Sequence, residues 1–191
     1  RGFDVTVIKN AVDLKRWTME PPKFSRPLHV AFIGRLAQVK GINEFLAAAR
    51  EMAATAGSPE FIFHLAGDGP ARDDALALER AGHLRFHGPL PNEAVPNFLR
   101  DMDVCVALTF AGSNLEGGSG GAGVSNSLLE QMAAGRVLIC WNNPAYRQVL
   151  DERSAYLVKQ GDASAISAAL REIACDQGEA SARAQRAVEL A

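Results

Sequence analysis

The chain has 191 residues, of which 48% are hydrophobic and 22% charged, and its formal net charge is −2. This composition is typical of a folded globular protein. It excludes a disordered chain and a polybasic protein whose main partner is nucleic acid. No apolar run reaches the length of a membrane span, and no segment has the pattern of a signal peptide.

The three cysteines, Cys105, Cys140 and Cys175, lie far apart in the sequence and form no C-x-x-C pair. Because their number is odd and they fall in apolar patterns, we expect reduced, buried thiols in a cytosolic protein and no metal site. The first residue is Arg1, so we expect the sequence to be part of a longer chain.

Apolar, β-rich runs alternate with segments of helical period along most of the chain. The runs are continuously apolar, as expected for strands that are buried on both faces. Strands are predicted at residues 29–34, 61–66, 84–87, 104–108, 137–141 and 155–158. Helices are predicted at residues 42–56, 71–81, 92–100, 127–134, 145–150 and 163–174. Such repeated β–α units predict an α/β fold, a Rossmann-like doubly wound parallel sheet of about six strands with helices on both faces.

The two ends of the chain are less regular than its middle. Residues 5–8 predict a short strand, and the proline-containing segment 20–27 is typical of a linker. We therefore expect residues 1–27 to be a linker and the remnant of a preceding domain. The folded domain should span residues 28–176, and residues 177–191 should form a truncated helical tail.

In an open parallel sheet, ligands bind at the carboxyl ends of the strands. The first predicted strand ends at Gly34, and a loop with Arg35 and Lys40 then leads into a helix. Two cations beside the free N–H groups of a helix N-terminus suit a phosphate or diphosphate. The alternative is a solvated loop with ordinary surface cations. The Gly-Asp-Gly-Pro loop at residues 67–70 predicts a tight turn.

A glycine-rich loop, LEGGSGGAGVSN, follows the fourth predicted strand. Residues 118–123 read G-x-G-x-x-G, but the dinucleotide fingerprint must directly follow the first strand and needs an acidic residue about 20 positions later. Here several residues separate the strand from the glycines, and the later positions are Trp141, Asn142 and Asn143. Neither NAD nor FAD is therefore expected, and no Walker sequence occurs.

The glycine-rich loop remains a candidate phosphate site at a helix start. Glycines let a phosphate approach the backbone closely, and Val124, Ser125 and Asn126 offer N–H groups. Glu130 lies one turn into the helix, where its carboxylate could accept hydrogen bonds from the hydroxyl pair of a ribose. Alternatively, Ser127 and Glu130 form an S-x-x-E capping box, in which Glu130 only satisfies a backbone N–H.

Five segments of the sequence together carry a resemblance to a known family: VTVIKNAVDLKRW, VAFIGRLAQVKGINEFL, FHLAGDGP, LRFHGPLPNEAVPNFLRDMDVCVAL and GVSNSLLEQMAAGRVLI. In this order they resemble the carboxy-terminal, donor-binding domain of group 1 retaining glycosyltransferases, which are built from two Rossmann-like domains (GT-B). The resemblance covers residues 5–174. Each segment is weakly specific by itself, whereas their order and spacing are strongly so.

The resemblance implies a role for each matching residue. Arg35 and Lys40 would hold the nucleotide diphosphate and stabilise the charge of the leaving group. The remaining donor-site residues would be Gly34 beside the phosphates, Phe86 and His87 at the base, Gly123, Val124 and Ser125 at the phosphates, and Glu130 at the ribose. The donor would be a UDP- or GDP-sugar, with no essential metal and no tightly bound cofactor. The acceptor hydroxyl would be held by the preceding, N-terminal domain, so the isolated domain should be inactive.

One position departs from the family pattern, which has two glutamates separated by seven residues. Counting back from Glu130 places the first at Ala122, whereas counting forward from the fourth strand places it near Gly112, so the loop is longer here. Our hypothesis is that Glu116, or a backbone group of the loop, takes over the contact with the donor sugar. The alternative is that this contact is lost. We expect residues 110–121 to be a flexible lid that is poorly ordered without ligand.

The resemblance implies a hexosyltransferase acting in the cytoplasm or peripherally at the inner face of the membrane, which the other domain would contact. Bacterial envelope polysaccharide or glycolipid assembly is the commonest setting for such enzymes. Two other functions remain open: a non-catalytic nucleotide-sugar-binding scaffold, and a nucleotide-sugar epimerase of the same architecture. His29 and His64 lie within strands and are expected to be core or edge residues. Trp141 and Tyr146 are expected to pack, although each could line a sugar pocket.

Overall fold

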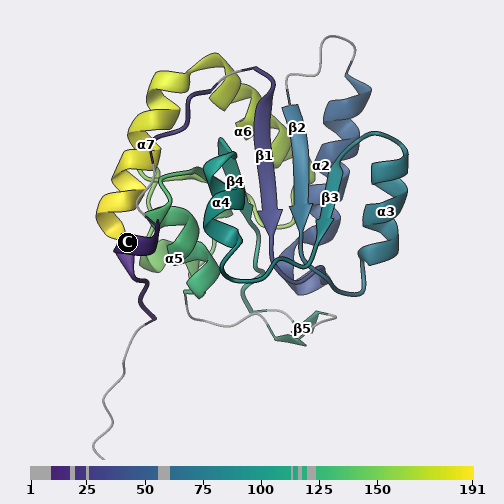
Figure 1. Cartoon of the computed structure of the whole chain (residues 1–191), viewed down its shortest axis with the longest axis horizontal. Helices are drawn as coiled ribbons and strands as arrows, with labels where there is room; N and C mark the ends of the chain where they lie inside the picture. Colours follow the sequence, from purple (N-terminus) through teal and green to yellow (C-terminus); the bar gives the residue numbers. More distant parts are fainter. Residues whose placement is uncertain are drawn as a thin grey trace, which may run out of the picture.

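The structure is a computed structural model that describes residues 10–17, 20–24, 26–55, 61–112, 114–115, 118–119 and 124–191. The six predicted strands form one parallel sheet (Figure 1). The strands are β1 (Leu28–Ile33), β2 (Phe61–Ala66), β3 (Arg85–Gly88), β4 (Val104–Ala107), β7 (Val137–Trp141) and β8 (Tyr156–Val158). The strand predicted at residues 5–8 lies outside the described residues.

The strand order in the sheet is β3-β2-β1-β4-β7-β8. β1 and β4 are therefore neighbours, although β2 and β3 separate them in the sequence. The chain leaves the centre of the sheet toward β3, crosses back, and then continues toward β8. This reversal makes the fold doubly wound and confirms the predicted Rossmann-like α/β architecture. The switch point, where ligands bind in such sheets, lies between β1 and β4.

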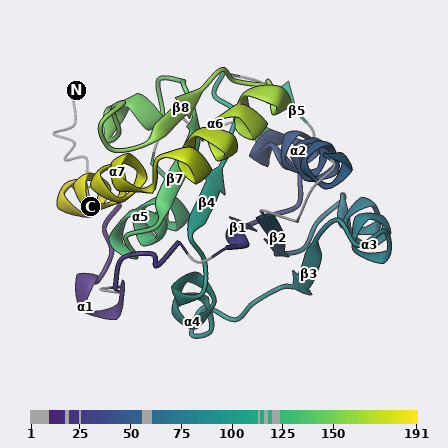
Figure 2. The same cartoon turned by 90° about the horizontal axis from the view of Figure 1, so that it is seen from above.

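Helices cover both faces of the sheet, as predicted. One face is covered by α2 (Ile42–Ala54), α3 (Arg72–Arg80) and α6 (Ala163–Cys175), and the other by α4 (Val95–Arg100) and α5 (Asn126–Ala133) (Figure 2). The helix predicted at residues 145–150 is only a 3₁₀ turn, η2 (Tyr146–Gln148). The side chain of Asn143, before this turn, accepts the N–H groups of Ala145 and Tyr146. After the turn, the hydroxyl of Ser154 accepts the N–H of Asp151.

The centre of the sheet is the core of the molecule. Every residue of β7 is buried, from Val137 to Trp141, and so are Val104 and Cys105 of β4. Strands covered on both faces need apolar side chains on both faces, which explains why their sequences are continuous apolar runs. Cys105 and Cys140 are buried as predicted, but Cys175 is exposed, because it is the last residue of α6 and faces away from the core.

The predicted linker is fastened to the domain by two buried charged residues. The guanidinium of Arg136 donates to the carbonyl of Met102 over 3.0 Å and to the carbonyl of Glu20. The carboxylate of Asp103 accepts the N–H of His29 at 2.8 Å and the N–H of Phe24 at 3.3 Å. Residues 20–24 therefore lie against the body of the domain, at the edge where the strands begin.

The predicted helical tail is α7 (Gln177–Leu190), and it packs on the domain. Asp176 caps its first turn by accepting the N–H of Glu179 at 2.9 Å. Ala180, Ala184 and Ala187 form a buried stripe, and the helix contacts α5 and β7. Small side chains at this spacing let α7 approach closely. Within the described part of the chain, no helix combines the length and apolarity needed to cross a membrane.

Candidate functional site

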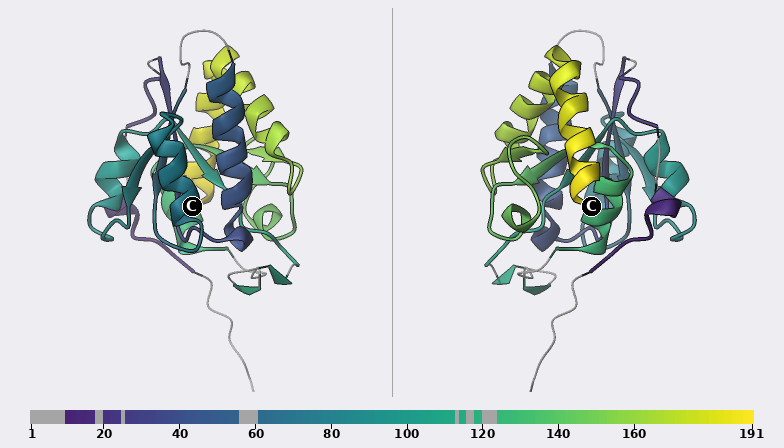
Figure 3. Two further views of the ribbon diagram at one scale, coloured as in Figure 1. Left: turned by 90° about the vertical axis from the view of Figure 1, so that its right-hand side faces the viewer. Right: turned by 90° about the vertical axis from the view of Figure 1, so that its left-hand side faces the viewer.

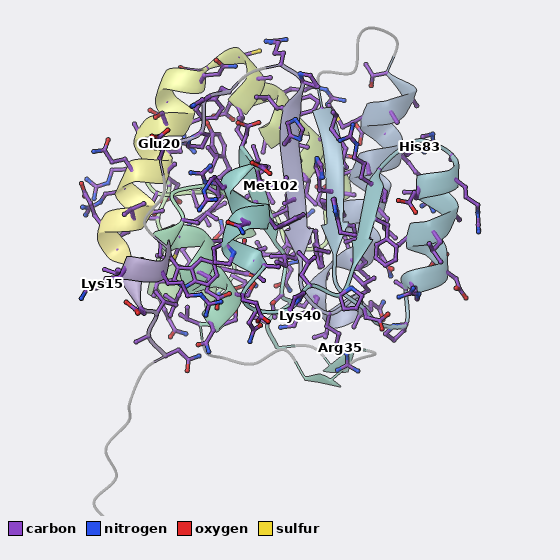
Figure 4. The ribbon with its side chains drawn as sticks, in the orientation of Figure 1. Lys15, Glu20, Arg35, Lys40, His83 and Met102 are labelled. Atoms are coloured by element: carbon purple, nitrogen blue, oxygen red, sulfur yellow. The ribbon has the colours of Figure 1, made fainter. Side chains whose placement is uncertain are left out.

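The loops that follow β1, β2, β3 and β4 meet at one edge of the sheet. Arg35 and Lys40 lie together at this edge (Figure 4). A short antiparallel pair, β5 (Asn114–Leu115) and β6 (Gly118–Ser119), projects from the same edge (Figure 3). The predicted phosphate-binding loops are thus brought together where a doubly wound sheet binds its ligands.

The loop that carries Arg35 is braced by the loop after β2. Leu36 donates its N–H to the carbonyl of Asp68 at 2.9 Å, and Ala71 donates its N–H to the carbonyl of Leu36 at 3.0 Å. Gly67 has a φ of +145°, and a Cβ there would lie only 1.8 Å from the carbonyl oxygen of Gly34. The turn predicted at residues 67–70 is therefore present, and it supports the loop that presents Arg35.

Lys40 ends a 3₁₀ turn, η1 (Gln38–Lys40), and its side chain is half-buried. Its Nζ atom lies 3.3 Å from Oγ1 of Thr109. Burial, together with the positive charge of Arg35, lowers the pKa of Lys40 below its usual value. Gly41 follows with a φ of +74°, packed so closely that a Cβ would meet Cβ of Leu108 at 2.3 Å. Lys40 is thus held against the end of β4.

The capping box predicted as an alternative for Glu130 is not formed. The helix begins one residue earlier than predicted, and its cap is Ser125, whose Oγ accepts the N–H of Leu128 at 3.2 Å. Ser127 lies inside the helix, and its Oγ accepts a hydrogen bond from Gln131 at 3.0 Å. Glu130 is therefore not the residue that completes the cap. Burial raises the pKa of Glu130, and the positive charge of Arg16 partly opposes this rise.

A cavity of about 320 Å³, called the main cavity below because it holds the predicted site residues, lies at this edge. It brings Gly34, Arg35 and Glu130 together. An added Cβ on Gly34 would meet no atom within 4 Å, so its backbone faces open space. The cavity is lined by residues from the ends of β1, β2 and β3, from the start of α4 and from α5: Ile33, Gly34, Arg35, Ala66, Gly67, Asp68, Pro89, Leu90, Asn92, Val95, Ser127 and Glu130.

Lys40 lines two smaller spaces next to this cavity, of about 100 and 70 Å³. Thr109, Ser125, Leu128 and Tyr146 line both of them, and Gly34 also lines the smaller one. Gly34 therefore borders both the main cavity and the space near Lys40. Val124 lines the larger of the two spaces, and its carbonyl accepts a hydrogen bond from Asn10 at 2.8 Å.

The residues predicted at the base, Phe86 and His87, do not line the main cavity, and His87 lines a different one. The N–H of Phe86 donates to the carboxylate of Glu79 at 2.8 Å. The side chain of His87 instead contacts His64, with 3.0 Å between their ring nitrogens. Pro89, Leu90 and Asn92, which follow β3, line the cavity. The sequence signal for them was present: they follow a predicted strand at the binding edge by a few residues.

A larger cavity, of about 1000 Å³, lies toward the opposite end of the strands, where Glu20 and Met102 line it (Figure 4). His29, His64 and His87 form a row of imidazoles in this cavity, with 2.9 Å between Nδ1 of His29 and Nε2 of His64. Burial first, and then the charges of neighbouring basic groups, lower the pKa of His64 to about 3. His64 is buried and His29 half-buried, in line with their predicted places in strands.

Glu116 and Gly123 lie outside the described residues, and so does the position of Ala122. The first residues of the predicted lid are firmly held. The N–H of Phe110 donates to the carbonyl of Val39 at 2.9 Å, and the N–H of Ala111 donates to Gln160 at 3.2 Å. The ring of Phe110 also packs edge-on against Trp141. These contacts attach the first two residues of the predicted lid to the domain, and several of its later residues lie outside the described ones.

The chain resembles several characterised proteins. It is 32% identical over 156 residues, 79% of this chain, to the 2-deoxystreptamine N-acetyl-D-glucosaminyltransferase of Streptomyces fradiae. It is 31% identical over 179 residues, 88% of this chain, to the phosphatidyl-myo-inositol mannosyltransferase of Mycolicibacterium smegmatis. These matches span only 34% and 42% of the lengths of those two proteins.

Two solved structures have the same fold. The C-terminal domain of a group 1 glycosyltransferase (LpcC) from Francisella tularensis superposes with a TM-score of 0.73 at 19% identity, covering 94% of this chain and 96% of that one. Anabaena HepE, solved in complex with UDP, superposes with a TM-score of 0.76 at 15% identity, covering 97% of this chain and 52% of that one. The family model for group 1 glycosyl transferases matches residues 27–176. The chain therefore belongs to the group 1 glycosyltransferases, and its sheet has the Rossmann-like fold of their C-terminal GT-B domains.

Proposed function

We propose that this chain is the donor-binding domain of a retaining hexosyltransferase, and that it binds a nucleotide diphosphate sugar at the edge where β1–β4 end. The observation that carries the proposal is the cavity that joins Gly34, Arg35 and Glu130 beside Lys40. The transfer itself would use an acceptor hydroxyl held by a different domain of the full-length enzyme. The nucleotide-bound structures of HepE favour UDP over GDP as the first nucleotide to test.

The phosphates would lie between two cations and a helix start. Arg35 is exposed at the mouth of the main cavity, and Lys40 borders the adjoining space. The first turn of α5 supplies the N–H groups of Asn126 and Ser127 and the positive end of its dipole. This arrangement stabilises the negative charge that develops on a departing diphosphate, which is electrostatic catalysis.

Glu130 would bind the ribose. Its carboxylate borders the main cavity on α5, and it is not used in capping the helix. A carboxylate can accept hydrogen bonds from both hydroxyls of a ribose, whereas an amide oxygen accepts them more weakly. The base would then lie beside Pro89 and Leu90, which supply apolar contact surface at the far side of the same cavity.

The donor sugar would extend past Gly34 toward Lys40 and the glycine-rich loop. We keep Glu116 as the residue proposed to contact it, since Ala122 stands where the family glutamate is expected. The alanine in place of the family glutamate at position 122 favours a second candidate function, a nucleotide-sugar-binding scaffold without catalysis. Transfer by the full-length protein to an acceptor separates the two, because the scaffold would bind the nucleotide and transfer nothing. A Glu116→Gln variant with unchanged transfer would remove Glu116 from the proposal.

The test is calorimetric titration of this chain with UDP, GDP and ADP. We expect UDP to bind best, and Glu130→Ala to weaken it about tenfold or more, because hydrogen bonds to charged groups contribute about 1.5–3 kcal/mol. Glu189→Ala is the matched control: Glu189 is exposed near the end of α7 and pairs with Arg186. Equal binding by wild type and Glu130→Ala would contradict the ribose assignment. Failure of all three nucleotides to bind would contradict the proposed function.

A further inference from the structure

Thr109 lies between Lys40, in the proposed donor site, and two buried residues, Tyr146 and Asn143. It follows β4, and its hydroxyl oxygen lies 3.3 Å from the ammonium of Lys40. Its own N–H donates to the hydroxyl of Tyr146 at 2.8 Å, and its carbonyl accepts a hydrogen bond from the side-chain amide of Asn143 at 3.1 Å. Thr109 thus contacts Lys40 with its side chain and is held from behind through its backbone.

The residues behind Thr109 are themselves fixed. Tyr146 and Asn143 are each only 5% exposed. The side-chain oxygen of Asn143 accepts the N–H groups of Ala145 at 3.1 Å and Tyr146 at 3.2 Å, and its amide nitrogen donates to Gln160 at 2.8 Å. Burial raises the pKa of Tyr146 above its usual value, so its hydroxyl stays protonated. A buried, fully bonded support of this kind leaves Thr109 little freedom.

The turn that carries Lys40 is attached to the same segment. The N–H of Phe110 donates to the carbonyl of Val39 at 2.9 Å, and Gly41 packs directly on Leu108. These contacts fix the backbone of Lys40 but not its side chain, which has four rotatable bonds and loses up to about 2 kcal/mol of rotamer entropy when it is ordered. The hydroxyl of Thr109 is a contact that can order the ammonium itself.

A neutral acceptor suits this task better than a charged one. A carboxylate beside Lys40 would neutralise the ammonium and compete with a phosphate for it. A hydroxyl accepts one hydrogen bond and leaves both the charge and the other two N–H donors of the ammonium for a ligand.

We infer that Thr109 is a positioning residue for Lys40: its hydroxyl orients the ammonium toward the diphosphate of the donor, and Tyr146 and Asn143 hold Thr109 in place. The inference rests on the proposed function, because it takes a bound diphosphate as the target of Lys40. It assigns Tyr146 a role in donor binding through Thr109 and not by direct contact with the sugar.

The test compares UDP with uridine, which lacks the diphosphate. Thr109→Val keeps the size of the side chain but removes the acceptor, and it should weaken UDP binding about five- to tenfold while leaving uridine binding unchanged. Thr109→Ser restores the hydroxyl and should recover most of the lost affinity. Thr55→Val, at the exposed end of α2, is the matched control and should bind UDP like wild type.

A double-mutant cycle separates positioning from general damage to the fold. In a Lys40→Ala background, Thr109→Val should cost no further UDP affinity, because the group that it orients is gone. Tyr146→Phe, which removes the acceptor of the Thr109 N–H, should weaken UDP in wild type and have less effect in the Lys40→Ala background. Thermal unfolding of each variant shows whether it is folded. If Thr109→Val does not fold, Tyr146→Phe in the two backgrounds carries the test.

The failure of this inference differs from that of the proposed function. If wild type does not bind UDP, the proposed function is wrong, and the inference falls with it. If wild type binds UDP, Lys40→Ala weakens it and Thr109→Val has no effect, the donor site stands and the positioning role of Thr109 is wrong. Equal losses for UDP and uridine in folded Thr109→Val would also contradict the inference, because only the diphosphate should respond.

Discussion

His64 and His87 face each other across neighbouring strands, with Nδ1 of His64 3.0 Å from Nε2 of His87. On its other side, His64 meets His29 at 2.9 Å. Each of these two contacts needs one nitrogen that carries a hydrogen and one that does not. The row can take up one extra proton and keep both hydrogen bonds. With two extra protons, at least one contact would join two N–H groups, and the row would break.

This row predicts a loss of stability in acid. In the folded chain the pKa of His64 is about 3, below its value of about 6.5 in an unfolded chain. The unfolded chain therefore binds more protons between these two values. The free energy of unfolding should fall as the pH drops from 6.5 toward 3, by up to about 1.4 kcal/mol per pH unit for one proton.

Chemical denaturation at a series of pH values measures this slope. NMR of the imidazole resonances should show His64 still neutral at pH 5. His64→Phe removes the central titrating group and keeps a ring between His29, His87 and Phe98, so its stability should depend less on pH. An unchanged slope in His64→Phe would assign the acid sensitivity to other groups.

Nucleotide binding should also weaken in acid, for a different reason. Burial raises the pKa of Glu130 above its usual value, with Arg16 opposing this. Only the ionised carboxylate accepts from both ribose hydroxyls without a competing proton, so UDP affinity should fall as the pH drops through that raised pKa. Calorimetry should show the affinity beginning to fall at a higher pH than an exposed glutamate would give, and then by about tenfold for each pH unit below the raised pKa.

Glu130→Gln provides the comparison for this pH dependence. Its amide does not titrate, so it should bind UDP more weakly than wild type at pH 7 and show little change toward pH 5. A parallel loss of affinity in both proteins would show that another group, such as the phosphates of the nucleotide, controls the pH dependence.

Gly67→Ala should disrupt the loop that presents Arg35. A Cβ at this position would lie 1.8 Å from the carbonyl oxygen of Gly34, and the φ of +145° disfavours any side chain. We expect a loss of stability of about 2–4 kcal/mol, together with weaker UDP binding in whatever fraction folds. Gly82→Ala is the control: Gly82 has a φ of +76°, but no atom lies within 4 Å of the added Cβ.

The control isolates the effect of the contact from that of backbone strain. Gly82→Ala should cost about 1–2 kcal/mol through strain alone and leave UDP affinity unchanged. Chemical denaturation gives both stabilities. Equal losses for the two variants would show that the close packing of Gly67 on Gly34 contributes nothing beyond the strain at positive φ.

The centre of the sheet could be predicted from the sequence because its strands are buried on both faces. β2 and β7 match their predicted bounds, since β7 is a continuous apolar run and β2 is interrupted only by His64. The start of α5 was harder to place because Ser125 and Ser127 are both good caps in sequence terms. The chain geometry decides for Ser125, and this choice releases Glu130 from the cap.

The rest of the site depends on contacts that local patterns do not encode. The row of His29, His64 and His87 crosses β1, β2 and β3 diagonally. The register pairs His29 with Ile62 and His64 with Arg85, so each histidine lies two positions beyond the partner of the one before it. Thr109 and Tyr146 are 37 positions apart and meet because β4 and β7 are neighbours. Such pairs follow from the topology, which the sequence predicts only in outline.

The contact between Gly67 and Gly34 couples two glycine loops, the one after β1 and the one after β2, into a single rigid unit. Neither loop can be lengthened, shortened or given a side chain at this point unless the other changes with it, so variants in the Arg35 loop alone should be poorly tolerated. Residues 89–92, by contrast, border the same cavity and are not tied to that contact. A library designed to change the nucleotide that this domain accepts should therefore vary residues 89–92 and leave the two glycine loops untouched.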